Sequence, residues 1–367
     1  MNRFHLVPWH DPSEDTRPTR GGNPTMSSTQ QDPATASPDR ESTPASGPGL
    51  RRFAGVARTR LQSIGGPLGG LVLMVIAMSF LSEFFFTQRN LTNLISQISD
   101  YGILAAGAAL VILIGGIDLS VAANMALTMM FTAWLYREHE SPFALALVAG
   151  LLLGAFVGLV NGLLTTYGRV QPFVATLATM SACTGLALYI TQGSTINNFP
   201  SWFGNLTSAD VLGIPLQGLL LVAIFLVLGF WLRYRPGGRA LYAIGGNEEV
   251  ARLSGLPVRQ AKTMVYVIAG ALAAVAGWIN ISRLDSAQPT AGANYLLIVI
   301  AVVVIGGASL AGGVGSMGGA FIGLLIIGVL NNGLALLGIN PNLQAVVIGV
   351  VILAAVLTDR AGIKKRA

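Results

Sequence analysis

The chain has 367 residues, of which 53% are hydrophobic and only 10% are charged, and its formal net charge is +6. Soluble domains typically carry about 25% charged residues, so the composition excludes an ordinary soluble protein and favours lipid as the surrounding solvent. The basic residues cluster between apolar runs, which favours an orienting role in a membrane over binding to nucleic acid.

Residues 1–60 come before the first long apolar run and differ from the rest of the chain. Eight of the 17 prolines fall within the first 50 residues, together with many Ser and Thr. Such a segment buries too little apolar surface to offset its ordering entropy, so we expect a disordered tail. The apolar run starts near residue 67, too far along the chain for a cleavable leader.

Ten apolar segments then predict an all-α, polytopic transmembrane helix bundle over residues 61–360. A span needs about 20 residues, and somewhat fewer in some cases. The segments are 67–86, 101–117, 119–136, 143–164, 172–191, 214–232, 262–282, 293–308, 314–336 and 342–358.

The basic residues orient this bundle. Ten spans with a cytoplasmic N-terminus leave only three of the 22 Lys and Arg residues outside, namely Arg89, Arg137 and Arg283. Basic residues on inner loops are what the positive-inside rule predicts. We therefore expect both the N-terminal tail and the basic tail at residues 361–367 in the cytoplasm.

Short sequence matches suggest that the second half of the bundle repeats the first. They are Gly154-Ala155-Phe156 with Gly319-Ala320-Phe321, Asn161-Gly162-Leu163 with Asn332-Gly333-Leu334, and Gly168 then Pro172 with Gly338 then Pro341. The matches relate spans four and five to spans nine and ten. Five spans per copy give the copies opposite orientations, and inverted repeats are typical of transporters.

Glycines recur every four residues in two of the predicted spans. Gly150, Gly154 and Gly158 form one stripe, and Gly315, Gly319 and Gly323 form another. Small residues allow helix backbones to approach closely in lipid, so we expect tight helix packing there. Sliding of these stripes during gating would require that packing first.

A carboxylate interrupts the apolar runs at Asp118, within Gly115-Gly116-Ile117-Asp118-Leu119-Ser120. A charge at membrane depth is costly and usually faces a cavity or a partner, which makes Asp118 a candidate pathway residue with Ser120 and Asn161. Alternatively, Asp118 N-caps the third span. Asp285 lies 167 residues further on, near another span end, and is the candidate counterpart in the repeat.

The loop at residues 233–262 predicts a short cytoplasmic helix. Asn247 is a suitable N-cap, Glu248 and Glu249 fit the first turn, and Gly255 is a suitable stop. Val250 and Leu253 lie three residues apart and share one face, beside the small Ala251. A helix of two turns needs a docking surface, either the protein's own helix ends or the groove of a partner.

The sequence lacks the motifs that disulfide formation, metal binding, phosphate binding and catalysis usually require. Cys183 is a single cysteine and there are three histidines, so neither a disulfide nor a zinc-type metal site is expected. The chain has no phosphate-binding Gly-x-x-x-x-Gly-Lys-Ser/Thr motif and no cluster of acid, base and nucleophile. We therefore expect no cofactor and no enzymatic activity.

Four stretches resemble the permease subunits of ATP-binding-cassette importers for ribose-, arabinose- and xylose-type sugars. The likeness covers roughly residues 65–360. It rests on Gly238-Arg239, Ala243, Gly245, Asn247 and Ser254-Gly255 in the loop, on the segments 115–120, 161–162 with 172–177, and on 286–292 with 306–310. Ala122 stands where the family usually has glycine, and Asp285 where a small residue is common.

The resemblance implies a subunit that forms the pathway in a bacterial inner membrane. By analogy with the family, two permease copies pair, a cassette ATPase docks on the cytoplasmic loop, and a sugar-binding protein delivers a monosaccharide. The loop residues that would couple to the ATPase are Gly238, Arg239, Asn247, Glu248, Ala251, Arg252, Ser254 and Gly255.

Two alternatives to this function remain at the sequence level. An ion-coupled secondary transporter often carries charges within its spans, whereas the predicted spans contain almost none beyond Glu83. A permease for branched-chain amino acids would keep the same machinery and change only the cargo.

Overall fold

A computed structural model describes residues 48–211 and 213–364. The predicted disordered tail over residues 1–47 and the basic residues Lys365 and Arg366 lie outside the described residues. The described residues from Arg51 to Lys364 belong to one packed unit.

Helices dominate the described residues. In chain order they are α1 (Pro48–Leu81), α2 (Gln88–Leu113), α3 (Val121–Arg137), α4 (Phe143–Thr166), α5 (Pro172–Thr191), α6 (Ser201–Ser208), α7 (Leu216–Tyr234), α8 (Pro236–Gly246), α9 (Glu248–Leu253), α10 (Val258–Leu284), α11 (Tyr295–Ile305), α12 (Met317–Leu336) and α13 (Pro341–Lys364).

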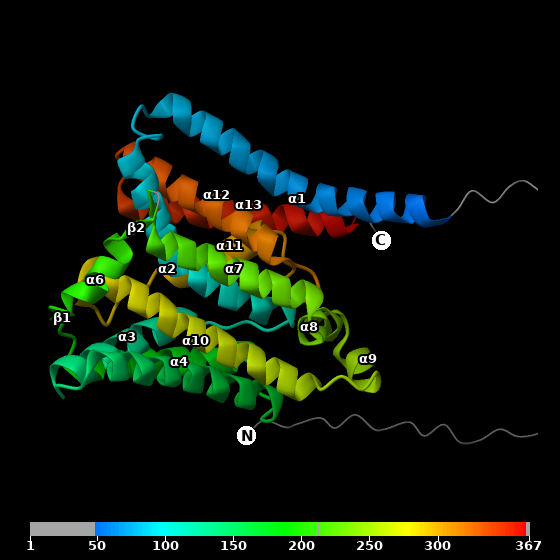
Figure 1. Ribbon diagram of the computed structural model, residues 1–367. Coiled ribbons are helices and arrows are strands. Elements are labelled where there is room, and N and C mark those ends of the chain that lie inside the picture. Colours follow the sequence, from blue (N-terminus) through cyan, green and yellow to red (C-terminus); the bar gives the residue numbers. More distant parts are fainter. Residues whose placement is uncertain (1–47, 212, 365–367) are drawn as a thin grey trace, which may run out of the picture. The chain divides into compact units, whose positions relative to one another are not determined.

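In the part of the chain that the structure describes, four two-residue strands form two antiparallel pairs. Strand β1 (Ile196–Asn197) pairs with β4 (Ser286–Ala287), and β2 (Asp210–Val211) pairs with β3 (Ile214–Pro215). The first pair ties the connection after α5 to the end of α10. Figure 1 shows β1 and α6 at one end of the long helices, and α8 and α9 beyond the opposite end.

Each predicted apolar segment coincides with one helix, so the all-α transmembrane bundle is confirmed. Six described helices, α2, α4, α5, α7, α10 and α12, are long and apolar enough to cross a membrane. The apolar parts of α1, α11 and α13 are shorter, and α3 has 17 residues. Helix α1 begins at Pro48, so it includes residues 48–60, which the sequence places in the tail.

The predicted glycine stripes mediate close helix packing. A Cβ atom at Gly154 would lie 2.5 Å from the Gly270 carbonyl oxygen of α10, and one at Gly158 would overlap the Tyr266 carbonyl oxygen. Gly150 faces Thr132 of α3 instead. In the second stripe, Gly319 and Gly323 approach the backbone of α11 and its C-terminal end. Gly315 lies in the loop before α12, which begins at Met317, so it is not part of a helical stripe. The packing prediction is therefore confirmed for the stripe on α4 and for two of the three glycines in the second stripe.

Buried and exposed apolar residues divide as expected for a bundle in lipid. Helix α10 lies near the centre and packs against α4, α2 and α3. Helices α4, α5 and α7 instead expose large apolar side chains such as Leu152, Leu186 and Leu226. These exposed side chains would be unfavourable in water and suit contact with lipid or with another membrane helix.

Candidate functional site

Hydrogen-bonded polar side chains connect the N-terminal end of α3 with α4 and α5. Oδ1 of Asp118 accepts hydrogen bonds from the backbone N–H and the hydroxyl of Ser120, at 2.8 and 2.6 Å. The Asn161 amide donates to Ser120 Oγ at 2.8 Å, and the Thr179 hydroxyl donates to Asn161 Oδ1 at 2.7 Å. Asp118, Ser120 and Asn161 are all buried.

Three of the four candidate pathway residues therefore meet, and the fourth lies elsewhere. Asp285 adopts a left-handed conformation with φ of 47° at the end of α10, and its carboxylate accepts from the Phe199 backbone N–H at 3.0 Å. Asp118 does not N-cap the third span. Ser120 occupies that position without a side-chain cap bond, because Asp118 lies two residues earlier and engages Ser120 itself.

Thr179 was not predicted from the sequence, and it offers a specific test of this cluster. Thr179→Val removes the donor to Asn161 Oδ1 and leaves that buried oxygen without a partner, which typically costs about 1–3 kcal/mol. We expect a lower unfolding temperature of the purified protein. Thr184→Val on the exposed side of the same helix is the matched control and should change nothing. Equal effects of the two changes would contradict the assignment.

The loop that the sequence places at residues 233–262 forms two helices, α8 and α9, of which only α9 was predicted. Asn247 N-caps α9 as expected, its side chain accepting from the Val250 N–H at 3.0 Å. Gly255 ends the segment with φ of +79°. Helix α8 begins at Pro236, because proline suits the first turn of a helix.

The eight predicted coupling residues divide into two groups. Ala251 is buried against the protein's own core, and Gly238 packs against the end of α7, so neither is available to a partner. The exposed residues of the set are Arg239, Asn247, Glu248, Arg252, Ser254 and Gly255. Val250 and Leu253 are 58% and 73% exposed, which leaves an apolar patch on α9 uncovered by the chain itself.

Two ion pairs involve α9. Arg252 contacts Glu249 at 2.5 Å, and its hydrogen bonds and charge hold the pKa of the Glu249 carboxyl below its ordinary value. A lowered pKa favours the carboxylate, so this contribution is present at neutral pH and is lost as the pH falls through the lowered pKa. The second pair, Glu248 with Lys262 of α10 at 2.9 Å, links α9 to the next helix.

Three glycine-rich segments, two of which carry the family resemblance, meet at one backbone junction. A Cβ atom at Gly245 of α8 would overlap the Leu113 carbonyl oxygen and lie 2.5 Å from the Gly313 nitrogen. One at Gly312 would lie 2.7 Å from the Gly115 nitrogen. The Gly313 N–H also donates to the Leu113 carbonyl at 2.8 Å. Helix α8 therefore rests directly on the end of α2 and on the loop before α12.

An ion pair between a buried aspartate and a partly exposed arginine joins α2 to α10. Asp100 is fully buried, and its Oδ2 lies 2.7 Å from Nη2 of Arg283. The same oxygen accepts from the Asn280 amide at 2.8 Å and from the Tyr295 hydroxyl at 3.3 Å.

This pair corrects the expectation that the spans carry almost no charge. Helix α2 begins at Gln88 and α10 continues to Leu284, so both charges lie within helices. The apolar runs alone placed the span boundaries just beside these residues. An aspartate directly before one apolar run and an arginine directly after another were the available signal.

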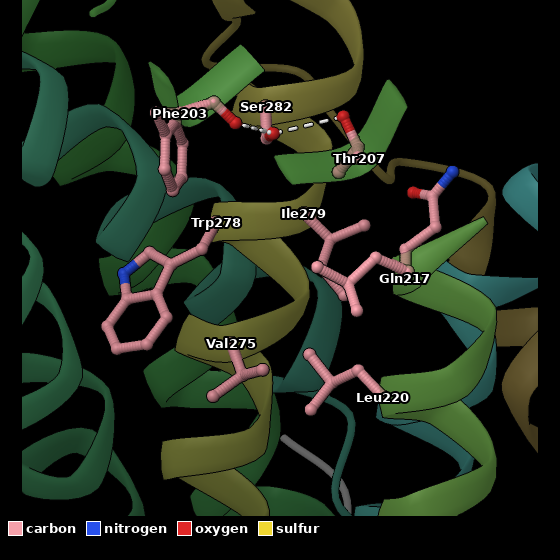
Figure 2. A pocket seen from close by; sticks show the side chains of 9 residues that line it. Phe203, Thr207, Gln217, Leu220, Val275, Trp278, Ile279 and Ser282 are labelled. Carbon is pink, nitrogen blue, oxygen red and sulfur yellow. Dashed lines mark hydrogen bonds between the residues drawn. The ribbon is translucent and has the colours of Figure 1, made fainter. Parts of the chain in front are cut away.

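A pocket of about 160 Å³ lies between α7 and α10, beside α6 (Figure 2). The Ser282 hydroxyl donates to the Phe203 carbonyl and lies 3.0 Å from Thr207 Oγ1, which fastens α10 to α6. The walls are mostly apolar and offer few partners for the hydroxyl groups of a sugar. The lining residues are Phe203, Thr207, Leu216, Gln217, Leu220, Val275, Trp278, Ile279 and Ser282.

Many long apolar helices with buried polar groups between them define a multi-pass membrane protein. Among the described residues, no group of His, Cys, Asp and Glu is arranged to hold a metal ion. Over residues 90–356 the sequence matches the family described as "Branched-chain amino acid transport system / permease component". The chain belongs to this family and is a permease component rather than an enzyme.

Three proteins similar to this chain are named for the sugar ribose or arabinose. The chain is 47% identical over 297 residues to the ribose import permease protein RbsC of Bacillus subtilis, covering 80% of this chain and 92% of that protein. It is 44% identical over 296 residues to RbsC of Escherichia coli K12, with 79% and 91% coverage. It is 39% identical over 295 residues to the L-arabinose transport system permease protein AraH of the same organism, with 80% and 90% coverage.

Proposed function

We propose that this chain forms the pathway of an ATP-driven importer that carries a monosaccharide, with D-ribose as the first candidate. The similarity to ribose import permeases over nearly their whole length carries this proposal. The family description names branched-chain amino acids, but the similar proteins just described are named for ribose and arabinose. Leucine is therefore the competing cargo.

The proposed topology has ten spans, with both termini on the cytoplasmic side of a bacterial inner membrane. The ten proposed spans are the six long apolar helices together with α1, α3, α11 and α13. An inverted repeat is supported by the order of the two helix pairs. In each pair a helix with a buried asparagine, Asn161 or Asn332, is followed by a short turn and a helix that begins at proline.

In the proposed mechanism, the polar cluster of Asp118, Ser120, Asn161 and Thr179 borders the pathway. Its amide and hydroxyl groups suit an uncharged polyol, because they both donate and accept hydrogen bonds. A soluble sugar-binding protein would deliver the solute and do most of the selection. In this proposal one copy does not enclose the pathway by itself, and a second permease copy would complete it.

A cassette ATPase would dock on α8 and α9. The exposed apolar side chains of Val250 and Leu253 on α9, together with the exposed Arg252 of the same helix, support this assignment. An apolar patch rimmed by charge is typical of a protein interface. The short link between α9 and α10, reinforced by Glu248 and Lys262, would pass movement of the ATPase into the bundle.

Leu253 tests the docking surface. Leu253→Asp places a charge in the centre of the proposed interface without disturbing the fold, because the side chain is 73% exposed. We expect normal amounts of folded permease with at least about tenfold less bound ATPase, the usual effect at an interface hot spot. Leu253→Met, which keeps the apolar contact, is the control. Undiminished ATPase binding by Leu253→Asp would rule out this surface.

The cargo is tested by uptake into proteoliposomes that contain the permease, its ATPase and its binding protein. The proposal predicts accumulation of labelled D-ribose that requires ATP and is unaffected by collapsing ion gradients. Accumulation of leucine in place of ribose would shift the assignment to amino acids. Uptake driven by an ion gradient without ATP would assign the chain to secondary transport.

A further inference from the structure

The contact between Asp100 and Arg283 uses only half of its bonding capacity. Nη2 of Arg283 reaches Oδ2 of Asp100, while Oδ1 of Asp100 and Nε of Arg283 are both buried. Neither of these two atoms has a hydrogen-bond partner among the described residues. Asn280 and Tyr295 both donate to Oδ2 as well, so the hydrogen bonds of the Asp100 carboxylate all fall on one oxygen.

The two unpartnered atoms are the ones that a second bond would join. Nε–H and one Nη–H of a guanidinium point in the same direction, and together they match the two oxygens of a carboxylate. One of these two parallel bonds is made at 2.7 Å, and the other is open at both its donor and its acceptor. A small shift of α10 along or about its axis relative to α2 would close it.

Unpaired buried polar atoms raise the free energy of this conformation. An unsatisfied donor or acceptor costs more than an ordinary hydrogen bond contributes, and the cost is greater for charged groups in a dry interior. A contact that served only to hold the fold together would be better satisfied or replaced by apolar packing. The half-made pair instead favours movement toward a conformation with both bonds.

The position of Arg283 links that movement to the cytoplasmic helices. Helix α10 has 27 residues, about 40 Å, and Arg283 lies in its last turn. Its first turns are joined to α9 by Lys262 and Glu248. Movement of α9 would therefore reach the pair through one continuous helix, as the docking of an ATPase in the proposed function requires.

We propose that Asp100 and Arg283 form a two-state contact between α2 and α10. One hydrogen bond joins them in this conformation, and two parallel bonds join them in the other conformation of the transport cycle. Neither residue needs to touch the solute, so both are positioning residues. The proposal rests on the proposed function only for its link to ATP.

Arg283→Lys tests the second bond specifically. Lysine keeps the positive charge beside Asp100, but its ammonium is a point charge that does not provide the two-nitrogen fork. Arg89→Lys, at an exposed position on α2, is the matched control. Each variant is assembled with the ATPase and binding protein, and three quantities are measured: assembled complex, ATP hydrolysis, and solute moved per ATP.

We expect Arg283→Lys to assemble and hydrolyse ATP like the wild type and to move at least about tenfold less solute per ATP, since the lost bond is charge-assisted. Arg89→Lys should match the wild type. Normal solute movement by Arg283→Lys would overturn the proposal. A loss of assembled complex would overturn it too, because the pair would then be a fold contact. A wild-type complex that moves no sugar would count against the proposed function instead.

Discussion

Gly245→Ala is expected to destabilise the protein and abolish transport. The added methyl group would overlap the Leu113 carbonyl oxygen and press on the Gly313 nitrogen at 2.5 Å. Both obstacles are backbone atoms, which do not move aside as a flexible side chain would. The hydrogen bond from the Gly313 N–H to the same carbonyl, 2.8 Å long, would be strained or broken. Overpacking of this kind costs about 1–3 kcal/mol, and sometimes more.

The adjacent glycine provides the control. Gly246→Ala adds the same methyl group where no atom lies within 4 Å, so stability and uptake should match the wild type. Thermal unfolding of the purified protein and solute uptake by membrane vesicles measure the two effects. If both glycines tolerate alanine equally, the junction between α8, the end of α2 and the loop before α12 does not exist in the working protein.

Gly158→Ala should have a comparably large effect in the centre of the bundle. Its methyl group would overlap the Tyr266 carbonyl oxygen and lie 3.0 Å from the Cα atom of Val267. Helices α4 and α10 would have to separate, which removes van der Waals contacts along their whole length. We expect a loss of about 3 kcal/mol or more, close to the upper end for overpacked cores.

Gly185→Ala on α5 is the matched comparison, because its methyl group would meet nothing within 4 Å. The readout is the amount of protein that stays monodisperse in detergent after heating. Equal heat resistance of the two variants would contradict close packing of α4 on α10.

The helix bundle was predictable from the apolar segments. Backbone polar groups inside lipid must be hydrogen-bonded within the protein, and a helix satisfies them within one segment. Each predicted span has its helix, and the spacing of Gly154, Gly158, Gly319 and Gly323 indicated which faces would pack closely. The start of α9 was predictable for a local reason, since the Asn247 side chain caps a helix within its own first turn.

Contacts between distant segments were not predictable from periodicity. Asp100 and Arg283 are 183 residues apart, and each lies just outside an apolar run. Hydropathy alone predicts that a helix ends at the last apolar residue. Here α2 begins before its apolar run and α10 continues past its own, and each extension contains a charged residue whose partner lies on the other helix. Thr179 was missed for a similar reason, because its importance comes from Asn161 on another helix.

Helices α6 and α8 were also absent from the sequence prediction. Each is short and lies between longer apolar segments, with eight and eleven residues. Helices of this length draw most of their stability from tertiary packing rather than from their own sequence. For α8 that packing is the close contact of Gly245 with Leu113 and Gly313, which forms only when the end of α2 and the loop before α12 are in place.

The measurement that tests the central claim most directly is purification of the tagged protein from its native membrane in a mild detergent, followed by mass spectrometry of its partners. A pathway subunit of an ATP-driven importer should recover a cassette ATPase in near-stoichiometric amount, and Leu253→Asp should lose it. A clean preparation without any ATPase, under conditions that preserve a known importer purified in parallel, would contradict the assignment.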